Sequence, residues 1–125
     1  MRLNQLTIPS LDVEKSVAFY MKLGLQLIVD ALPRYVRFEL PDGEATFSIH
    51  LVEELPSGDG ITIYFEDDNL DKVVSELQEK GIEFSLLPTN QRWLWREAHL
   101  LDPDGNKIIL FFGGDNRKNP PWRIQ

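Results

Sequence analysis

Apolar residues recur at the spacing of an α-helix in two short segments of the chain. The first segment has Asp12 as a suitable N-cap and Gly24 just past its end. The second segment begins after Asp68 or Asn69 and ends before Gly81. The apolar positions in the two segments are Val13, Val17, Tyr20, Met21, Leu70, Val73, Val74 and Leu77. This pattern predicts two helices, each with one face turned toward a core.

The surroundings of the two predicted helices repeat along the chain. A shift of 57 residues places Val17 on Val74 and Leu6 on Ile63 (74 − 17 = 63 − 6 = 57). An alternating strand precedes each helix, three strand candidates follow it, and a Pro-Asp-Gly turn joins the last two strands of each repeat. The preceding strands are residues 3–8 and 61–66, and the turns are residues 41–43 and 103–105. The sequence therefore predicts the order βαβββ twice.

This repeat indicates one α+β domain built from two modules that fold together. The segment Pro-Ser-Gly-Asp-Gly between the repeats is a natural linker. The expected divisions are module one over residues 1–55, the linker over residues 56–60, module two over residues 61–113 and a C-terminal tail over residues 114–125.

Two motifs in this arrangement resemble a known family. Residues 12–20, Asp-Val-Glu-Lys-Ser-Val-Ala-Phe-Tyr, together with Gly24, are similar to the first-helix signature of the vicinal oxygen chelate superfamily, which includes glyoxalases, bleomycin-resistance proteins and extradiol dioxygenases. Residues 102–106, Asp-Pro-Asp-Gly-Asn, resemble its final hairpin. The resemblance covers nearly the whole chain. It implies tandem βαβββ modules whose curved mixed sheets form a cup that binds ligands.

Composition removes several functional classes. The chain has 20 acidic and 13 basic residues, a formal charge of −7, and no basic stripe, which disfavours nucleic acid as a partner. It has no cysteine, so disulfides, thiolate metal sites and cysteine nucleophiles are excluded. The N-terminus does not resemble a secretion signal, and no apolar run approaches the roughly 18 residues of a membrane span. We expect a cytoplasmic protein that does not bind membranes.

Alternation with period two assigns each strand residue to the helix-facing core or to the cup. The predicted core residues are Leu6, Ile8, Phe47, Ile49, Leu51, Ile61, Ile63, Phe65, Ala98, Leu100, Ile108 and Leu110. If the last hairpin loop spans residues 102–106, His99 lies opposite Ile109 and Glu97 opposite Phe111, all on the cup side. A slip of one residue would exchange every assignment on these strands.

The resemblance also implies where a metal would be bound in metal-dependent relatives. Those ligand positions correspond to Gln5, Ser48, Thr62 and Ile109. Only Gln5 resembles a ligand, because Ile109 has no donor and the two hydroxyls are weak neutral ones. We expect no metal and no cofactor. Lactoylglutathione lyase and extradiol dioxygenase activities, which need the metal as a Lewis acid, are therefore not expected.

The leading hypothesis is a metal-free small-molecule-binding protein with an aromatic-lined cup. The predicted ligand-binding residues are Gln5, Tyr35, Arg37, Ser48, His50, Thr62, Tyr64, Trp93, Trp95, Glu97, His99, Ile109 and Phe111. One alternative is a lyase, isomerase or hydrolase that uses His99 with Glu97, or His50, as acid and base, with or without a displaced metal. Another is an interaction protein whose cup is filled by its own side chains.

We further expect a homodimer, since relatives complete or shield their cups by pairing modules. The segment Pro120-Pro121-Trp122 could belong to that contact or to a disordered tail, and the sequence leaves both open.

Overall fold

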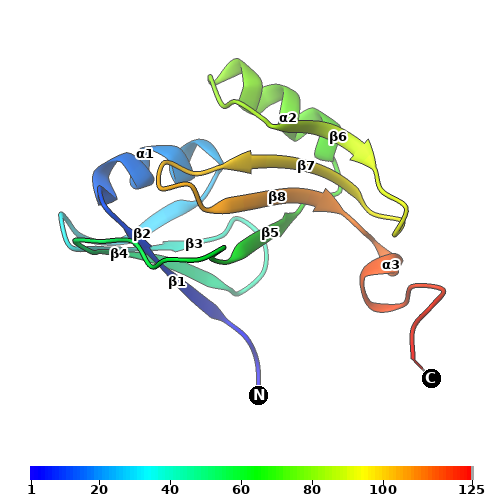
Figure 1. Ribbon diagram of the computed structural model, residues 1–125, viewed down its shortest axis with the longest axis horizontal. Coiled ribbons are helices and arrows are strands. Elements are labelled where there is room, and N and C mark those ends of the chain that lie inside the picture. Colours follow the sequence, from blue (N-terminus) through cyan, green and yellow to red (C-terminus); the bar gives the residue numbers. More distant parts are fainter. Residues whose placement is uncertain (125) are drawn as a thin grey trace. The chain divides into compact units, whose positions relative to one another are not determined.

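The computed structural model describes residues 1–124 and follows the order βαβββ twice, with a short helix after the second repeat (Figure 1). The elements are β1 (Gln5–Ser10), α1 (Val13–Lys22), β2 (Gln26–Ala31), β3 (Tyr35–Glu39), β4 (Thr46–Leu51), β5 (Thr62–Glu66), α2 (Leu70–Glu79), β6 (Leu86–Asn90), β7 (Arg96–Leu101), β8 (Lys107–Phe112) and α3 (Asp115–Lys118). The predicted α+β fold of two βαβββ modules is confirmed.

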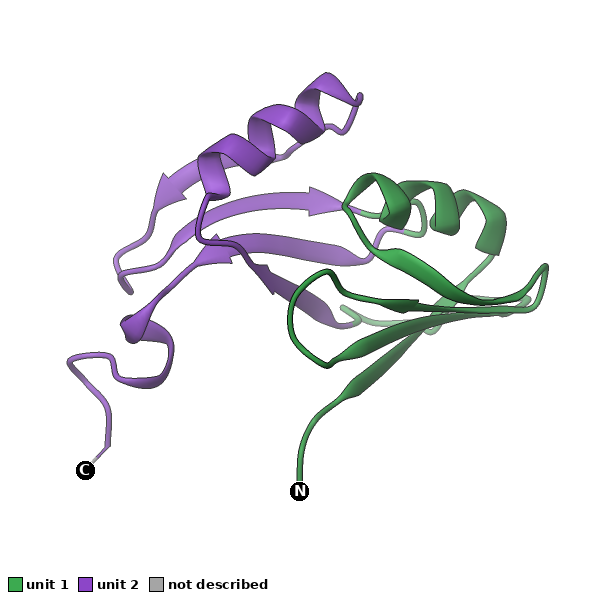
Figure 2. Cartoon of the chain, turned by 180° about the vertical axis from the view of Figure 1, so that it is seen from behind, with its two compact units in different colours: residues 1–60, 102–104 green, residues 61–101, 105–125 purple. Residues whose placement is uncertain are grey.

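Each module forms its own mixed four-stranded sheet. The strand orders are β1-β4-β3-β2 and β5-β8-β7-β6, in which β1 pairs with β4, and β5 with β8, in parallel while the other neighbours are antiparallel. The chain divides into two compact units, shown in Figure 2. Unit 1 contains residues 1–60 and 102–104, and unit 2 contains residues 61–101 and the chain from residue 105 onward. In each unit the helix lies along one face of the sheet (Figure 2).

The core of unit 1 forms around Tyr20 on α1. Asp12 begins the helix by accepting a hydrogen bond from the Lys15 amide at 3.2 Å, as its N-cap position predicts. The Tyr20 ring lies 4.8 Å from that of Phe47 and 6.3 Å from that of Phe38, between their centroids. All three side chains are buried. Helix α1 therefore covers the apolar face of its sheet.

The core of unit 2 is aliphatic. Helix α2 buries Leu70, Val74 and Leu77 of the predicted apolar stripe, and its N-cap is Asn69, one of the two predicted caps. Asn69 takes the N-cap position without a side-chain cap bond, while Asp67 accepts a hydrogen bond from the Asn69 amide at 2.8 Å. The sheet residues buried with this stripe include Ile63, Ala98, Leu100, Ile108 and Leu110.

Some predicted core residues are exposed. Leu6, Leu51 and Ile61 retain 37%, 41% and 43% of their accessible surface, and Met21 on α1 retains 52%. The prediction was wrong for these residues. Helix α1 has ten residues and spans only about 15 Å. It covers the middle of its sheet, whereas Leu6 and Leu51 lie toward strand ends and Ile61 precedes β5.

The turn between β7 and β8 is held by helix α1 and the segment before it. Asp102 accepts a hydrogen bond from the Tyr20 hydroxyl at 2.5 Å, and Asp104 accepts from the Ser16 hydroxyl at 3.0 Å and the Leu11 amide at 2.9 Å. Asp102 is only 5% exposed. Gly105 completes the turn with φ +84°, the positive φ that the Pro-Asp-Gly sequence predicts. Residues 102–104 thus belong to unit 1, although the strands they join belong to unit 2.

Burial raises the pKa of the Tyr20 hydroxyl above its ordinary value, and the negative charge of Asp102 raises it further. Folded and unfolded chains both keep this proton below pH 10, but above about pH 10 only the folded chain keeps it. Unfolding at alkaline pH therefore releases the Tyr20 proton. The stabilisation is complete below the unfolded pKa and decreases as the pH rises above it.

We predict that Tyr20→Phe removes this alkaline component of stability. Urea unfolding of the unmodified chain should lose about 1.4 kcal/mol per pH unit through Tyr20 above about pH 10, and the variant should lack that slope. At neutral pH the variant should be less stable by about 1.5–3 kcal/mol, since it lacks a hydrogen bond to a charged group. Tyr64→Phe, at a residue 49% exposed, is the neutral-pH control. If the free energies of unfolding of Tyr20→Phe and the unmodified chain fell equally with pH above about pH 10, Tyr20 would not be the group responsible for the slope.

Candidate functional site

The open face of the unit 1 sheet carries a row of polar side chains across three strands. Thr7 on β1, Ser48 on β4 and Arg37 on β3 are direct neighbours in the strand register. The Thr7 and Ser48 hydroxyl oxygens lie 2.6 Å apart, and Ser48 is fully buried. Arg37 Nε donates to the Tyr35 hydroxyl at 3.0 Å. This row gives unit 1 a fixed hydrogen-bonded group on the face opposite α1.

The Tyr35 hydroxyl is the most polarised group in this row. Its pKa is lowered below the ordinary tyrosine value, first by a hydrogen bond from Ser48 and then by the hydrogen bond and positive charge of Arg37. Partial desolvation acts in the opposite direction without cancelling this effect. The phenol oxygen accepts the hydrogen bond of Arg37 Nε, so its own proton remains for another acceptor.

An aromatic group covers part of the corresponding face of unit 2. The Trp95 ring stacks on the Phe111 ring, with centroids 4.4 Å apart and an angle of 20° between the planes. Tyr64 meets both rings edge-on, at 5.8 Å from Trp95 and 5.6 Å from Phe111. Phe111 is 3% exposed, whereas Tyr64 is 49% exposed. Trp95 and Tyr64 thus form the accessible surface of this aromatic group, and Phe111 supports it from below.

Two backbone features position Trp95. The turn before β7 is closed by the Gln91 amide donating to the Trp95 carbonyl at 2.8 Å, and Leu94 adopts φ +70° within it. That left-handed conformation costs an L-residue roughly 1–2 kcal/mol. At Gly113, an added Cβ would lie 3.0 Å from Trp95 Nε1. The indole ring therefore lies directly over a backbone that has no side chain.

The segment after β8 is fixed by Glu66. One carboxylate oxygen of Glu66 accepts from the amides of Gly113 at 2.8 Å and Gly114 at 3.0 Å, and the other lies 3.5 Å from Arg117 Nε. This holds the start of α3, whose Asn116 carbonyl accepts a hydrogen bond from Trp95 Nε1 at 3.2 Å. Glu66 therefore supports the aromatic group indirectly, because it holds the segment that accepts the hydrogen bond of Trp95.

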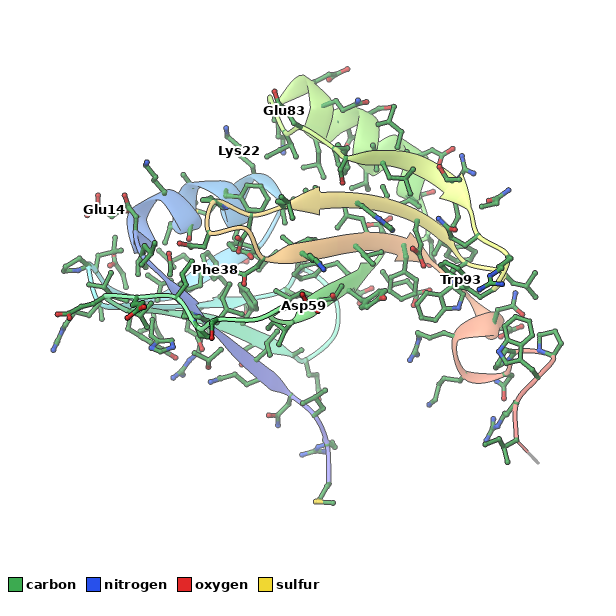
Figure 3. All side chains as sticks on the ribbon, viewed as in Figure 1. Glu14, Lys22, Phe38, Asp59, Glu83 and Trp93 are labelled. Carbon is green, nitrogen blue, oxygen red and sulfur yellow. The ribbon has the colours of Figure 1, made fainter. Side chains whose placement is uncertain are left out.

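A buried carboxylate orients two polar rings beside the aromatic group. Glu97 is 2% exposed, and its two oxygens contact Trp93 Nε1 at 2.7 Å and His99 Nε2 at 2.8 Å. Since a carboxylate only accepts, Nε2 of His99 carries the shared proton and Nδ1 is left as an acceptor. His99 remains about one-third exposed. Trp93 lies in the loop joining β6 and β7 (Figure 3).

The predicted register of the last hairpin is confirmed, because His99 pairs with Ile109 and Glu97 with Phe111. The predicted site residues then fall into two groups, one in each unit. Unit 1 carries Gln5, Tyr35, Arg37, Ser48 and His50, and unit 2 carries Thr62, Tyr64, Trp93, Trp95, Glu97, His99, Ile109 and Phe111. Ser48, Glu97 and Phe111 are buried, whereas His50 and Thr62 are exposed.

The residues at the inherited metal positions do not fit a divalent cation. Gln5 Oε1 already accepts a hydrogen bond from the Thr46 hydroxyl at 2.8 Å, and Ser48 is bonded to Thr7. Thr62 offers a neutral hydroxyl and Ile109 a hydrocarbon, neither of which is an adequate ligand. Among residues 1–124, no three His, Asp or Glu side chains lie close enough together to hold a metal ion.

Sequence analysis missed Leu94, Gly113 and the Asn116 carbonyl, which fix the position of Trp95. The Gly113-Gly114 pair directly after a strand is the signal available in the sequence, because glycine there often marks a close approach of other atoms. The positive φ of Leu94 leaves no such signal.

None of the helices in residues 1–124 is long and apolar enough to cross a membrane.

Comparison with known proteins agrees with this architecture. A sequence model of the Glyoxalase/Bleomycin resistance protein/Dioxygenase superfamily matches residues 2–110, while no curated protein matches the chain. The fold resembles that of a glyoxalase/bleomycin resistance protein/dioxygenase from Nocardioides, with a TM-score of 0.79, 24% identity and coverage of 100% of this chain and 90% of that one.

Two further solved structures show the same fold. A superfamily member from Sphaerobacter thermophilus is 25% identical, with a TM-score of 0.72 and coverage of 90% of this chain and 97% of that one. A bleomycin-binding protein complexed with bleomycin is 20% identical, with a TM-score of 0.73 and coverage of 91% and 99%. The chain belongs to the glyoxalase/bleomycin resistance protein/dioxygenase superfamily.

Proposed function

We propose that the protein is a metal-free small-molecule-binding member of its superfamily, and that an aromatic part of the ligand lies against Trp95 and Tyr64. The observation that carries this proposal is the supported aromatic surface in unit 2. Trp95 is fixed by its stack on Phe111 and by its hydrogen bond to Asn116, while Tyr64 stands edge-on beside it with about half of its surface exposed. Rigid aromatic rings offer contact area at low entropic cost.

The polar group beside these rings would orient the ligand. His99 presents Nδ1 as an acceptor because Glu97 holds Nε2, so a ligand hydroxyl or N–H could donate to it. The exposed edge of Trp93 extends the apolar surface, and its indole N–H is satisfied by Glu97. Glu97 and Phe111 therefore act from beneath the contact surface, and Trp93, Trp95, Tyr64 and His99 would touch the ligand.

The alternative of an interaction protein requires that its own side chains fill the binding surface. Trp95 does cover Phe111, and both tryptophans hydrogen-bond within unit 2. Tyr64 and Trp93 nevertheless keep 49% and 39% of their accessible surface, beside a partly exposed imidazole. Apolar rings next to an unsatisfied polar acceptor favour ligand binding. Bleomycin is one compound to test, because a protein of the same fold has been solved with it bound.

We also propose that the protein forms a homodimer in the cytoplasm and carries no metal. Native mass spectrometry of the purified chain should show the mass of two chains without bound Zn, Ni, Fe or Mn, because the inherited ligand positions offer too few donors. Elemental analysis gives an independent check of the metal content. A monomer at micromolar concentration would contradict the dimer, and about one metal per chain would contradict metal-free binding.

We predict that Trp95→Ala weakens binding of the neutral aromatic probe 2-naphthol by about tenfold or more. The variant loses a large apolar contact and its stacking energy, and about 1.4 kcal/mol corresponds to tenfold. Isothermal titration calorimetry measures the change. The matched control is Trp122→Ala, which removes an indole 58% exposed in the C-terminal segment and should leave the affinity unchanged. Equal affinities for Trp95→Ala and the unmodified chain would refute the aromatic site.

A second candidate function is acid–base catalysis by His99, and the 2.8 Å contact with Glu97 favours it. The pair has the arrangement of a base whose tautomer is set by a carboxylate. His50, the other histidine considered, is exposed on β4, and its imidazole makes no side-chain hydrogen bond found among residues 1–124. In such a reaction Nδ1 of His99 would accept a proton from a carbon next to a carbonyl and later return it.

Solvent exchange tests this second candidate. In D₂O, the protein should accelerate deuterium incorporation at the benzylic carbon of phenylpyruvate, measured by NMR against buffer alone. His99→Asn should abolish the acceleration, and His50→Asn should retain it. Exchange at the buffer rate with the unmodified chain, or loss only in His50→Asn, would exclude His99 as the base while leaving the binding proposal standing.

A further inference from the structure

Arg37 is a partly buried cation that has no carboxylate partner among residues 1–124. It takes part in none of the ion pairs found there. Two other arginines do have carboxylate partners, since Arg96 lies 2.8 Å from Asp71 and Arg117 lies 3.5 Å from Glu66. Glu39 lies on the same strand and face as Arg37 but makes no ion pair with it within the described chain. The other arginines without an ion pair within residues 1–124 are all exposed, whereas Arg37 is partly buried; these exposed residues are Arg2, Arg34, Arg92 and Arg123.

The position of the Arg37 guanidinium is fixed by its neighbours. Nε donates to the Tyr35 hydroxyl at 3.0 Å, and Cζ lies 5.6 Å from the centre of the Tyr35 ring. Ser48 is the cross-strand neighbour of Arg37. It is fully buried, and its hydroxyl is hydrogen-bonded to that of Thr7. With Nε occupied, the Nη1 and Nη2 ends have no acceptor within residues 1–124. They form the planar fork that binds two oxygens of one oxyanion.

Tyr35 adds a third donor to this fork. Its oxygen accepts the hydrogen bond of Arg37 Nε at 3.0 Å, so its own O–H is left to donate outward. The two guanidinium N–H groups and one phenol O–H together match the lone pairs of a carboxylate. One positive charge neutralises one negative charge, whereas a phosphate dianion would leave an excess negative charge on an already acidic protein.

We infer that Arg37 and Tyr35 form a binding site for the carboxylate of a small organic acid. The site stands on unit 1 alone and needs neither the aromatic surface of unit 2 nor the His99–Glu97 pair. It adds a charge requirement that the proposed function lacks: an anionic ligand is selected over its neutral analogue.

Titration of the full isotope-labelled chain with benzoate, followed by ¹H–¹⁵N NMR, tests the inference. Benzoate should shift the Arg37 Nε–H signal and the backbone amides of Arg37 and Ser48. Neutral benzamide should not shift them, and inorganic phosphate at matched ionic strength should bind more weakly than benzoate. Arg37→Gln should reduce benzoate affinity by about tenfold or more and Tyr35→Phe by about threefold, because charge-assisted hydrogen bonds are the stronger ones. Arg34→Gln, at an exposed residue of the same unit, is the matched control.

The signals that respond to benzoate distinguish this site from the aromatic one. A response at the Trp95 indole N–H without any at Arg37 would support the proposed function and overturn the carboxylate site. A response at Arg37 without any at Trp95 would do the reverse. Equal shifts with benzamide, tighter binding of phosphate, or unchanged affinity in a folded Arg37→Gln variant would each overturn the inference.

Discussion

The arrangement of the aromatic surface depends on the register of the hairpin formed by β7 and β8. Its turn is fixed on unit 1 by Asp102, which accepts from the buried Tyr20 hydroxyl, and by Asp104, which accepts from Ser16 and the Leu11 amide. A turn held at three points cannot slide along the strands. A slip of one residue would move Glu97, His99 and Phe111 to the opposite face of the sheet. The hydrogen bonds to Asp102 and Asp104 therefore oppose such a slip and help to keep Glu97, His99 and Phe111 on one face.

The two units use the same topology for different chemistry. In both, the helix covers the apolar face of a four-stranded sheet and leaves the other face open. The open face of unit 1 is a hydrogen-bonded polar row ending in an unpaired guanidinium, and that of unit 2 is an aromatic stack beside a carboxylate and an imidazole. A fold therefore specifies where side chains are presented, while the side chains themselves decide what is bound.

The residues at the positions that correspond to the family's metal ligands make other contacts or have no donor atom. Residues at the inherited positions have turned to structural hydrogen bonds, as Ser48 does with Thr7 and Gln5 with Thr46, or to hydrocarbon, as Ile109 does. Ser48 also lowers the pKa of the Tyr35 phenol and so polarises a group that could bind ligand.

Sequence alone determined the repeated βαβββ order, the two helices and the face on which most strand residues lie. These follow from local periodicity and from turns whose glycines need positive φ, as the confirmed pairing of His99 with Ile109 shows. Only the tertiary structure decided that Leu6 and Leu51 are exposed, because burial depends on how far α1 reaches over the sheet. It also decided that Trp95 covers Phe111 and that Arg37 has no carboxylate partner among residues 1–124. Ring stacking and charge pairing depend on distances between residues far apart in sequence, and on backbone details such as the φ of Leu94 and the bare Gly113, which period-two patterns do not encode.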